Sequence, residues 1–192
     1  VLDSHPEMKA TLNGPLPGYS FGQTALMAAV NRANRDIVDV LLRAGADINQ
    51  KSHWWAGPFH VLDGAASVPW MPSFLIGRGA VVEIHQAVQL GMIDDVRRML
   101  AEDPSLVHAR GGDGQLPLHF ARTVDMAEYL LDRGADINAR DVDHESPAAQ
   151  YMLRDRQAVA PCLVRRGAKA DVLLLAALGD VEDVERLLEA DP

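Results

Sequence analysis

The sequence predicts an all-α solenoid, in which short helix-turn-helix units stack one upon another. The first observation is a seven-residue sequence motif at 43–49 (RAGADIN) that recurs in similar form at 132–138 (DRGADIN). The second is the spacing of the motif's glycines, which lie 34 or 33 residues apart in neighbouring units. These pairs are Gly45 with Gly79 and Gly134 with Gly167. The third is the helical period of the apolar residues before each glycine, and together the three indicate a repeat architecture.

Each unit should end in an amphipathic helix that stops at a glycine. Within 37–42, the apolar residues Ile37, Val38, Leu41 and Leu42 follow helical spacing. Gly45 then comes where a helix C-cap needs left-handed backbone, which glycine adopts without strain. Leucine pairs such as Leu41-Leu42 and Leu130-Leu131 should be buried between units, at roughly 1.5–3 kcal/mol per side chain. Stacking of neighbours, rather than any single unit, should therefore stabilise the fold.

A second motif opens the first helix of each unit. It occurs as LPLHFA at 116–121 and TALMAA at 24–29, with shorter copies at 146–149 and 57–60. Thr24 and Ser146 can cap these helices through their hydroxyls, and Pro117 and Pro147 suit a first helical position. The motif resembles the Thr-Pro-Leu-His helix opening of the ankyrin repeat family, and the resemblance covers nearly the whole chain. It implies a curved array of helix pairs with short β-hairpin loops along one edge.

The phasing predicts a single array over residues 1–192, with about six units and incomplete terminal ones. The predicted units are 19–51, 52–79, 80–110, 111–140 and 141–169, preceded by the end of a unit at 1–18 and followed by a last unit at 170–192 whose hairpin is incomplete. The first helix of that last unit is strongly apolar, whereas terminal repeats usually have polar outer faces. We therefore expect the natural chain to continue beyond residue 192.

Prolines should disturb two of these units. Pro69 and Pro72 fall in the second helix of unit 52–79, and each removes a backbone donor, so this helix should start late and be short. Pro161 falls inside the second helix of unit 141–169 and should kink it.

Composition narrows the class of partner. The net charge is −9 with both signs interspersed, which argues against nucleic acid because phosphate binding needs a basic face. The same charge is compatible with a basic protein partner, although a negative charge also commonly serves solubility. One cysteine, Cys162, excludes an internal disulfide, and its apolar surroundings favour a buried side chain. No apolar run reaches the roughly 18 residues of a membrane span and no signal peptide is visible, so we expect a cytoplasmic protein. We also expect it to be a monomer.

Nothing in the sequence points to catalysis, and we expect no enzyme activity, cofactor or metal. There is no Gly-x-Ser-x-Gly elbow, Walker loop or Gly-x-Gly-x-x-Gly fingerprint. His60, His85 and His119 open the first helices of three units. The family resemblance gives histidines at this place a structural role, in which they tie helix openings to hairpins. One histidine per repeat also lies too far from the next for shared coordination at about 2 Å.

Two predicted hairpin tips offer candidate contacts, and each leaves an alternative open. Asp141 to Glu145 gathers three carboxylates and a histidine, which suits an exposed tip, a partner contact or a small-molecule or metal site. Trp54 and Trp55 form a pair at another tip, in a chain with only 5% aromatic residues. Tryptophan is enriched at interface hot spots, but these rings could instead cover the irregular unit 52–79.

The function expected from the resemblance is binding of a protein partner through the concave face and the hairpin tips. The candidate binding residues are His53, Trp54, Trp55, Asp113, Gln115, Asp143, His144, Glu145, Asn31, Arg32 and Arg154. A first alternative is a regulatory or targeting segment of a larger enzyme or effector. A second alternative is a small-molecule or metal site at 141–145.

Overall fold

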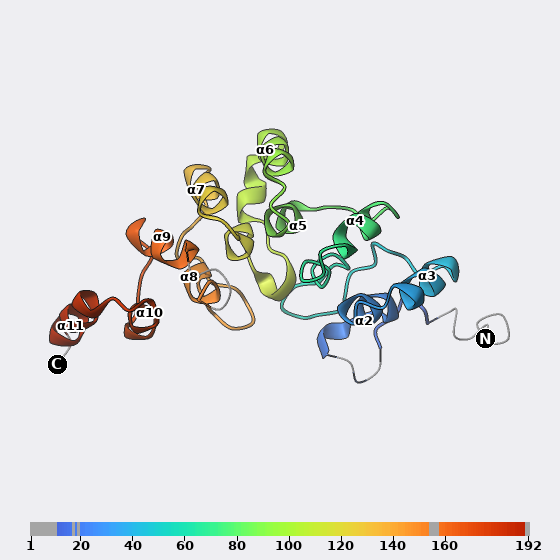
Figure 1. Ribbon diagram of the computed structural model, residues 1–192, viewed down its shortest axis with the longest axis horizontal. Coiled ribbons are helices and arrows are strands. Elements are labelled where there is room, and N and C mark those ends of the chain that lie inside the picture. The colour runs from blue at the N-terminus through green and yellow to red at the C-terminus, as the bar shows by residue number, and fades with distance from the viewer. Residues whose placement is uncertain (1–10, 17, 19, 154–157, 191–192) are drawn as a thin grey trace. The chain divides into compact units, whose positions relative to one another are not determined.

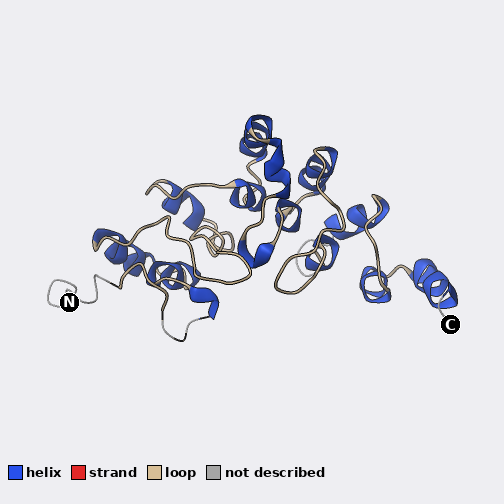
Figure 2. Ribbon diagram, turned by 180° about the vertical axis from the view of Figure 1, so that it is seen from behind, coloured by secondary structure: helices blue, strands red, loops and turns tan. Residues whose placement is uncertain are grey.

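The computed structural model describes residues 11–16, 18, 20–153 and 158–190, and these ranges contain helices and loops but no β-strand (Figures 1 and 2). The prediction of an all-α repeat fold is therefore confirmed. The chain divides into two compact units. The first unit holds the described residues up to Gln86 together with Gly111–Gly114, and the second holds Ala87–Arg110 and the described residues from Gln115 onward.

The first unit begins with a regular helix pair. Its elements are η2 (Ser20–Gly22), α2 (Ala25–Asn31), α3 (Arg35–Arg43), α4 (Met71–Ile76) and η4 (Gly112–Gly114). Thr24 caps α2 as predicted, because its Oγ1 accepts a hydrogen bond from the Met27 N–H at 3.3 Å. Asn34 caps α3 in the same way, with its Oδ1 accepting from the Ile37 N–H at 3.0 Å. Both caps satisfy amide groups that a helix leaves without intrahelical partners.

The predicted unit 52–79 is irregular, and prolines explain part of this. Residues 61–70 form successive turns, and α4 begins only at Met71. Pro72 lies in the first turn of α4, where its missing N–H costs nothing. The prediction of a late and short second helix is confirmed.

The second unit continues the helix pairs. Its elements are α6 (Ile93–Glu102), η3 (Pro104–His108), η5 (Pro117–Phe120), α7 (Val124–Asp132), α8 (Ala148–Tyr151), α9 (Val159–Arg165), α10 (Val172–Leu178) and α11 (Val181–Ala190), while the boundary between the two units falls within α5 (Ile84–Gln89). Pro117 opens η5 as expected, although this first helix is a 3₁₀ turn. Pro147, rather than Ser146, is the residue that precedes α8, one position later than expected.

The predicted kink at Pro161 is wrong. Helix α9 begins at Val159, so Pro161 lies within its first turn. The amide groups of a first turn have no intrahelical acceptor, and a proline there removes no hydrogen bond.

Four second helices end in the same glycine motif. Gly45, Gly79, Gly134 and Gly167 have φ angles of 98°, 96°, 93° and 95°. At the first of them, the Gly45 N–H donates to the Leu42 carbonyl at 3.1 Å and the following amide donates to the Leu41 carbonyl at 3.0 Å. This is the Schellman arrangement of a left-handed C-cap, so the predicted role of these glycines is confirmed.

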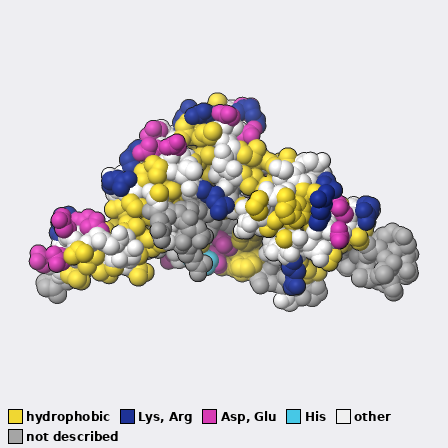
Figure 3. All heavy atoms as spheres, in the orientation of Figure 1, with side chains coloured by type: hydrophobic (Ala, Val, Ile, Leu, Met, Phe, Trp, Pro, Cys, Tyr) yellow, Lys and Arg dark blue, Asp and Glu magenta, His cyan; other side chains and the backbone are white. Residues whose placement is uncertain are grey.

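Each unit has its own apolar core. In the first unit, Leu62, Met71 and Leu75 are completely buried; in the second, Leu130 and Leu163 are. The predicted burial of leucine pairs holds only in part, since Leu41, Leu42 and Leu131 are half-buried. Figure 3 shows acidic and basic side chains interspersed on the visible surface rather than gathered into one basic face. Among the described residues, the helices are too short to cross a lipid bilayer.

Candidate functional site

Three residues at the hairpin tips adopt the left-handed backbone conformation, which fixes the directions of their side chains. Phe21, Asp113 and Glu145 have φ angles of 64°, 55° and 52°. A side chain in this region costs roughly 1–2 kcal/mol, so surrounding contacts must hold the backbone there. One such contact joins two tips of the first unit, where the His53 N–H donates to the Gly22 carbonyl at 3.0 Å.

An aromatic cluster covers the tips of the first unit. Phe21 makes edge contacts with Trp54 at 4.9 Å and with Phe59 at 5.5 Å between ring centroids. Trp54 also lies 5.9 Å from Trp55. Trp54 is half-buried by these contacts, whereas Trp55 is 70% exposed. The two open interpretations of the tryptophan pair therefore divide between its members, with Trp54 packing and Trp55 facing solvent.

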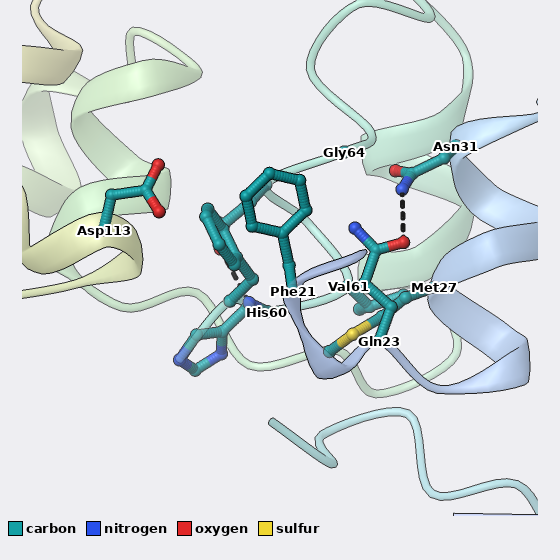
Figure 4. A pocket seen from close by; sticks show the side chains of 10 residues that line it. Phe21, Gln23, Met27, Asn31, His60, Val61, Gly64 and Asp113 are labelled. Atoms are coloured by element: carbon teal, nitrogen blue, oxygen red, sulfur yellow. Dashed lines mark hydrogen bonds between the residues drawn. The ribbon is translucent and has the colours of Figure 1, made fainter. Parts of the chain in front are cut away.

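A pocket of about 310 Å³ lies beside this cluster in the first unit (Figure 4). Phe21, Met27 and Phe59 supply apolar walls. Asn31 and Gln23 stand together at one end of the view, joined by a hydrogen bond from Asn31 Nδ2 to Gln23 Oε1 at 3.1 Å. This volume lies at the lower end of the range for small-ligand pockets, so it suits one side chain or a small molecule.

The pocket carries carboxylates and no lysine or arginine among the described residues that line it. Asp63 is fixed at both oxygens, accepting from the His60 N–H and from Gln86 Nε2, each at 2.6 Å. Asp113 lies at the opposite end of the view from the Gln23–Asn31 pair (Figure 4). Burial lowers the pKa of His60, although Glu83 and Asp63 act against this change, so its imidazole is neutral at pH 7.

The tip at 141–146 in the second unit is organised by one buried carboxylate. The Asp141 side chain is 0% exposed, and its Oδ1 accepts from the His144 N–H at 3.0 Å and the Ser146 N–H at 3.1 Å. His144 is 56% exposed in its side chain, with Nδ1 at 3.0 Å from the Tyr151 hydroxyl and 3.4 Å from Asp143 Oδ2. Asp141 therefore shapes the tip, while His144 is presented at its surface.

His119 ties a helix opening to this hairpin. Its Nδ1 accepts from the Leu116 N–H at 3.2 Å, and its Nε2 lies 3.1 Å from the Ser146 carbonyl. Burial lowers the pKa of His119 below its ordinary value, which keeps the ring neutral and lets it accept at one nitrogen and donate at the other. These contacts agree with the structural role expected for histidines at this place.

The other candidate residues differ in how far they are exposed to solvent. Asn31, Arg32, His53 and Glu145 are exposed and Asp143 is half-buried. Gln115 is only 8% exposed, which leaves little of it for a partner. Arg154 lies outside the described residues.

Sequence reasoning missed the residues that build the pocket, chiefly Phe21, Met27 and Phe59. A signal for Phe21 was present, because it precedes Thr24 by three residues, as Asp113 precedes Leu116. Met27 and Phe59 carry no such signal, since apolar residues beside a helix opening are ordinary core candidates. Cys162 is 2% exposed and burial raises its pKa, as expected of a structural thiol.

Comparison with known families and proteins gives consistent matches. Residues 21–53 and 113–142 match the family model described as ankyrin repeat. The "Putative ankyrin repeat protein FPV230" of Fowlpox virus is 28% identical over 133 residues, which are 64% of this chain and 70% of that protein.

Two further similar proteins are much longer than this chain. The "Serine/threonine-protein kinase VIK" of Arabidopsis thaliana is 47% identical over 57 residues, which are 28% of this chain and 13% of the kinase. The "Transient receptor potential cation channel subfamily A member 1" of Drosophila melanogaster is 27% identical over 165 residues, which are 82% of this chain and 12% of the channel. The chain thus spans about an eighth of each of these two relatives.

Proposed function

Since the chain belongs to the ankyrin repeat family, we propose that it binds a protein partner through its hairpin tips and first helices and catalyses no reaction of its own. Ankyrin repeats generally mediate protein–protein interaction, and the family is generally non-catalytic.

The exposed tryptophan at a hairpin tip carries the proposal. Trp55 is 70% exposed although aromatic residues make up only 5% of the chain. Large aromatic side chains at a surface are costly to leave in water and are typical anchors of interfaces. Trp54 contacts both Phe21 and Trp55, so it connects the exposed ring to the aromatic cluster.

The charge of the chain supports a basic partner. A net charge of −9 steers positively charged proteins toward the surface and repels acidic ones. The second unit contributes Asp143 and Glu145 beside the exposed His144 at its tip.

Affinity capture from a lysate of the source organism, followed by quantitative mass spectrometry, tests the proposal. The bait is the whole chain, compared with a Trp55→Ala/Asp143→Asn variant at the tips. The matched control is Leu173→Ala/Asp125→Asn, which changes an apolar side chain that is 68% exposed and one exposed aspartate away from the tips. A protein enriched by the parent and the control but lost by the tip variant supports the proposal; equal recovery by all three contradicts it.

A second candidate function is a regulatory or targeting segment of a larger enzyme or effector. The similarity to one protein kinase and one cation channel, each matched over about an eighth of its length, favours this candidate. Sequencing the parent gene beyond residues 1 and 192 tests it. An adjoining catalytic or channel domain would support this candidate, and stop codons close to both ends would exclude it.

A further inference from the structure

The pocket of the first unit has an acidic and aromatic lining that suits a positively charged group. Asp63 and Asp113 contribute two carboxylates, and the described lining residues include no lysine or arginine. The nearby Lys51 is already held by Glu83, with 2.9 Å between Nζ and Oε1. A cation that enters this space therefore meets a lining whose charged side chains are carboxylates.

The aromatic walls add a second attraction for a cation. The rings of Phe21 and Phe59 stand at 77° to each other with centroids 5.5 Å apart, so the two rings form a corner. The face of a phenyl ring is negative, and a cation within about 6 Å of its centroid is attracted to it. The same walls, together with Met27, give an aliphatic stem an apolar surface to cover.

The opposite end of the pocket offers hydrogen bonds to a peptide backbone. Gln23 uses its Oε1 to accept from Asn31, which turns its Nε2 group away from that bond (Figure 4). Amide groups are suited to a backbone carbonyl or N–H of an extended peptide, since they donate and accept. In Figure 4 this pair and Asp113 lie at opposite ends of the view, on either side of the Phe21 ring.

We propose that this pocket binds an arginine side chain of the partner, with the guanidinium near the Asp113 carboxylate and the stem against Phe21 and Phe59. The inference rests on the proposed protein-binding function and names the chemistry of one contact. Arginine suits the pocket better than lysine because its planar guanidinium stacks on aromatic faces and pairs with carboxylates through parallel N–H groups.

The probe for this inference is N-acetyl-arginine N-methylamide, titrated into the whole chain and followed by ¹H–¹⁵N NMR spectra. The neutral citrulline analogue serves as the comparison ligand, because it keeps the shape of the side chain and loses the charge. Saturable shifts are expected at the amides of Asn31, Gly64 and Gly114, with the arginine derivative only.

Two variants locate the contact. Asp113→Asn removes the carboxylate charge, and asparagine tolerates the left-handed backbone found at this position, with φ of 55°. It should raise the dissociation constant about fivefold or more, the loss expected for one charge-assisted hydrogen bond. Asp36→Asn changes an exposed aspartate on α3 of the same unit and leaves the net charge equal to that of Asp113→Asn, so it should bind like the parent chain.

Equal shifts with the citrulline analogue, equal weakening by both variants, or no saturable shift would each overturn the inference. Its failure is separable from failure of the proposed function. If the pocket does not bind the arginine derivative but the chain still captures a partner through Trp55 and Asp143, only the arginine contact is refuted. If the pocket binds the arginine derivative but the chain captures no partner, the proposed protein-binding function is refuted instead.

Discussion

At the scale of single residues, neighbouring carboxylates of one hairpin have different roles. Asp141 and Asp143 are two positions apart in a sequence that suggested one exposed acidic cluster. The structure buries the Asp141 carboxylate and surrounds its Oδ1 with two backbone N–H groups. Asp143 is half-buried, and its Oδ2 lies 3.4 Å from His144 Nδ1. Sequence alone could not separate these roles, because the difference arises from how the loop turns back on itself.

Asp141→Ala should destabilise the chain, and Asp143→Ala should not. Loss of the Asp141 carboxylate leaves the His144 and Ser146 amide groups without their acceptor, at about 1–3 kcal/mol. Removal of Asp143 breaks neither of these two hydrogen bonds, so it should change the free energy of unfolding by less than about 0.5 kcal/mol. Urea unfolding followed by circular dichroism measures both values. A comparable loss in the two variants would show that Asp141 is not the residue that organises the hairpin.

At the scale of elements, a neutral histidine makes one helix opening sensitive to acid. His119 Nδ1 accepts from the Leu116 N–H at the start of η5, while Nε2 donates to the Ser146 carbonyl of the hairpin. Protonation of Nδ1 would remove the acceptor for the Leu116 amide and so weaken the opening of η5. Burial lowers the pKa of this imidazole from its ordinary value of 6.5. In the unfolded chain the ring takes up a proton near pH 6.5, while in the folded chain it stays neutral to lower pH.

The free energy of unfolding should therefore fall as pH drops below 6.5 and should gain nothing from this residue above that value. His119→Gln replaces the titrating ring by an amide. Both proteins should lose stability between pH 7.5 and pH 5.5, but the variant should lose less. The difference between the two losses should be up to about 1 kcal/mol, which is the effect of one histidine over one pH unit. His60, whose pKa is also lowered by burial, remains in both proteins and keeps part of the slope. Equal pH dependence of the two chains in urea titrations would rule out this role for His119.

Elements differed in how far sequence could predict them. The helix ends at Gly45 and Gly134 and the cap at Thr24 were predictable, because capping depends on residues adjacent in sequence. The first helices were harder to predict, because residues 61–70 form turns and Pro117–Phe120 form a 3₁₀ helix. The exposure of Trp55 and the burial of Gln115 were not predictable, since neither follows from the residues adjacent in sequence.

At the scale of the whole molecule, Asn49 and Asn138 link neighbouring repeats at two places along the chain. Asn49 Oδ1 accepts from the Val81 N–H at 2.9 Å, and its Nδ2 donates to the Gly79 carbonyl at 3.1 Å. Asn138 Oδ1 accepts from the Lys169 N–H at 2.7 Å. One link lies in each compact unit. Repeat proteins gain stability from such neighbour-to-neighbour contacts, so loss of one link should have a local effect.

Hydrogen exchange can show whether the loss of one asparagine link affects only the neighbouring helices. The two asparagine variants serve as controls for each other. Asn138→Ala should accelerate amide exchange in α8 and α9 and leave α2 and α3 unchanged. Asn49→Ala should accelerate exchange in α4 and around Gly79 and leave α9 unchanged. Uniform acceleration along the chain in both variants would contradict nearest-neighbour stabilisation and indicate one cooperative unit.

A hydrogen-exchange footprint of the chain bound to its captured partner tests directly whether the hairpin tips form the interface. Binding through the tips should slow exchange in the segments that cover 52–57 and 141–146 and leave exchange in α3, α6 and α7 unchanged. Protection confined to those second helices, with both tips exchanging as in the free chain, would contradict binding through the hairpin tips.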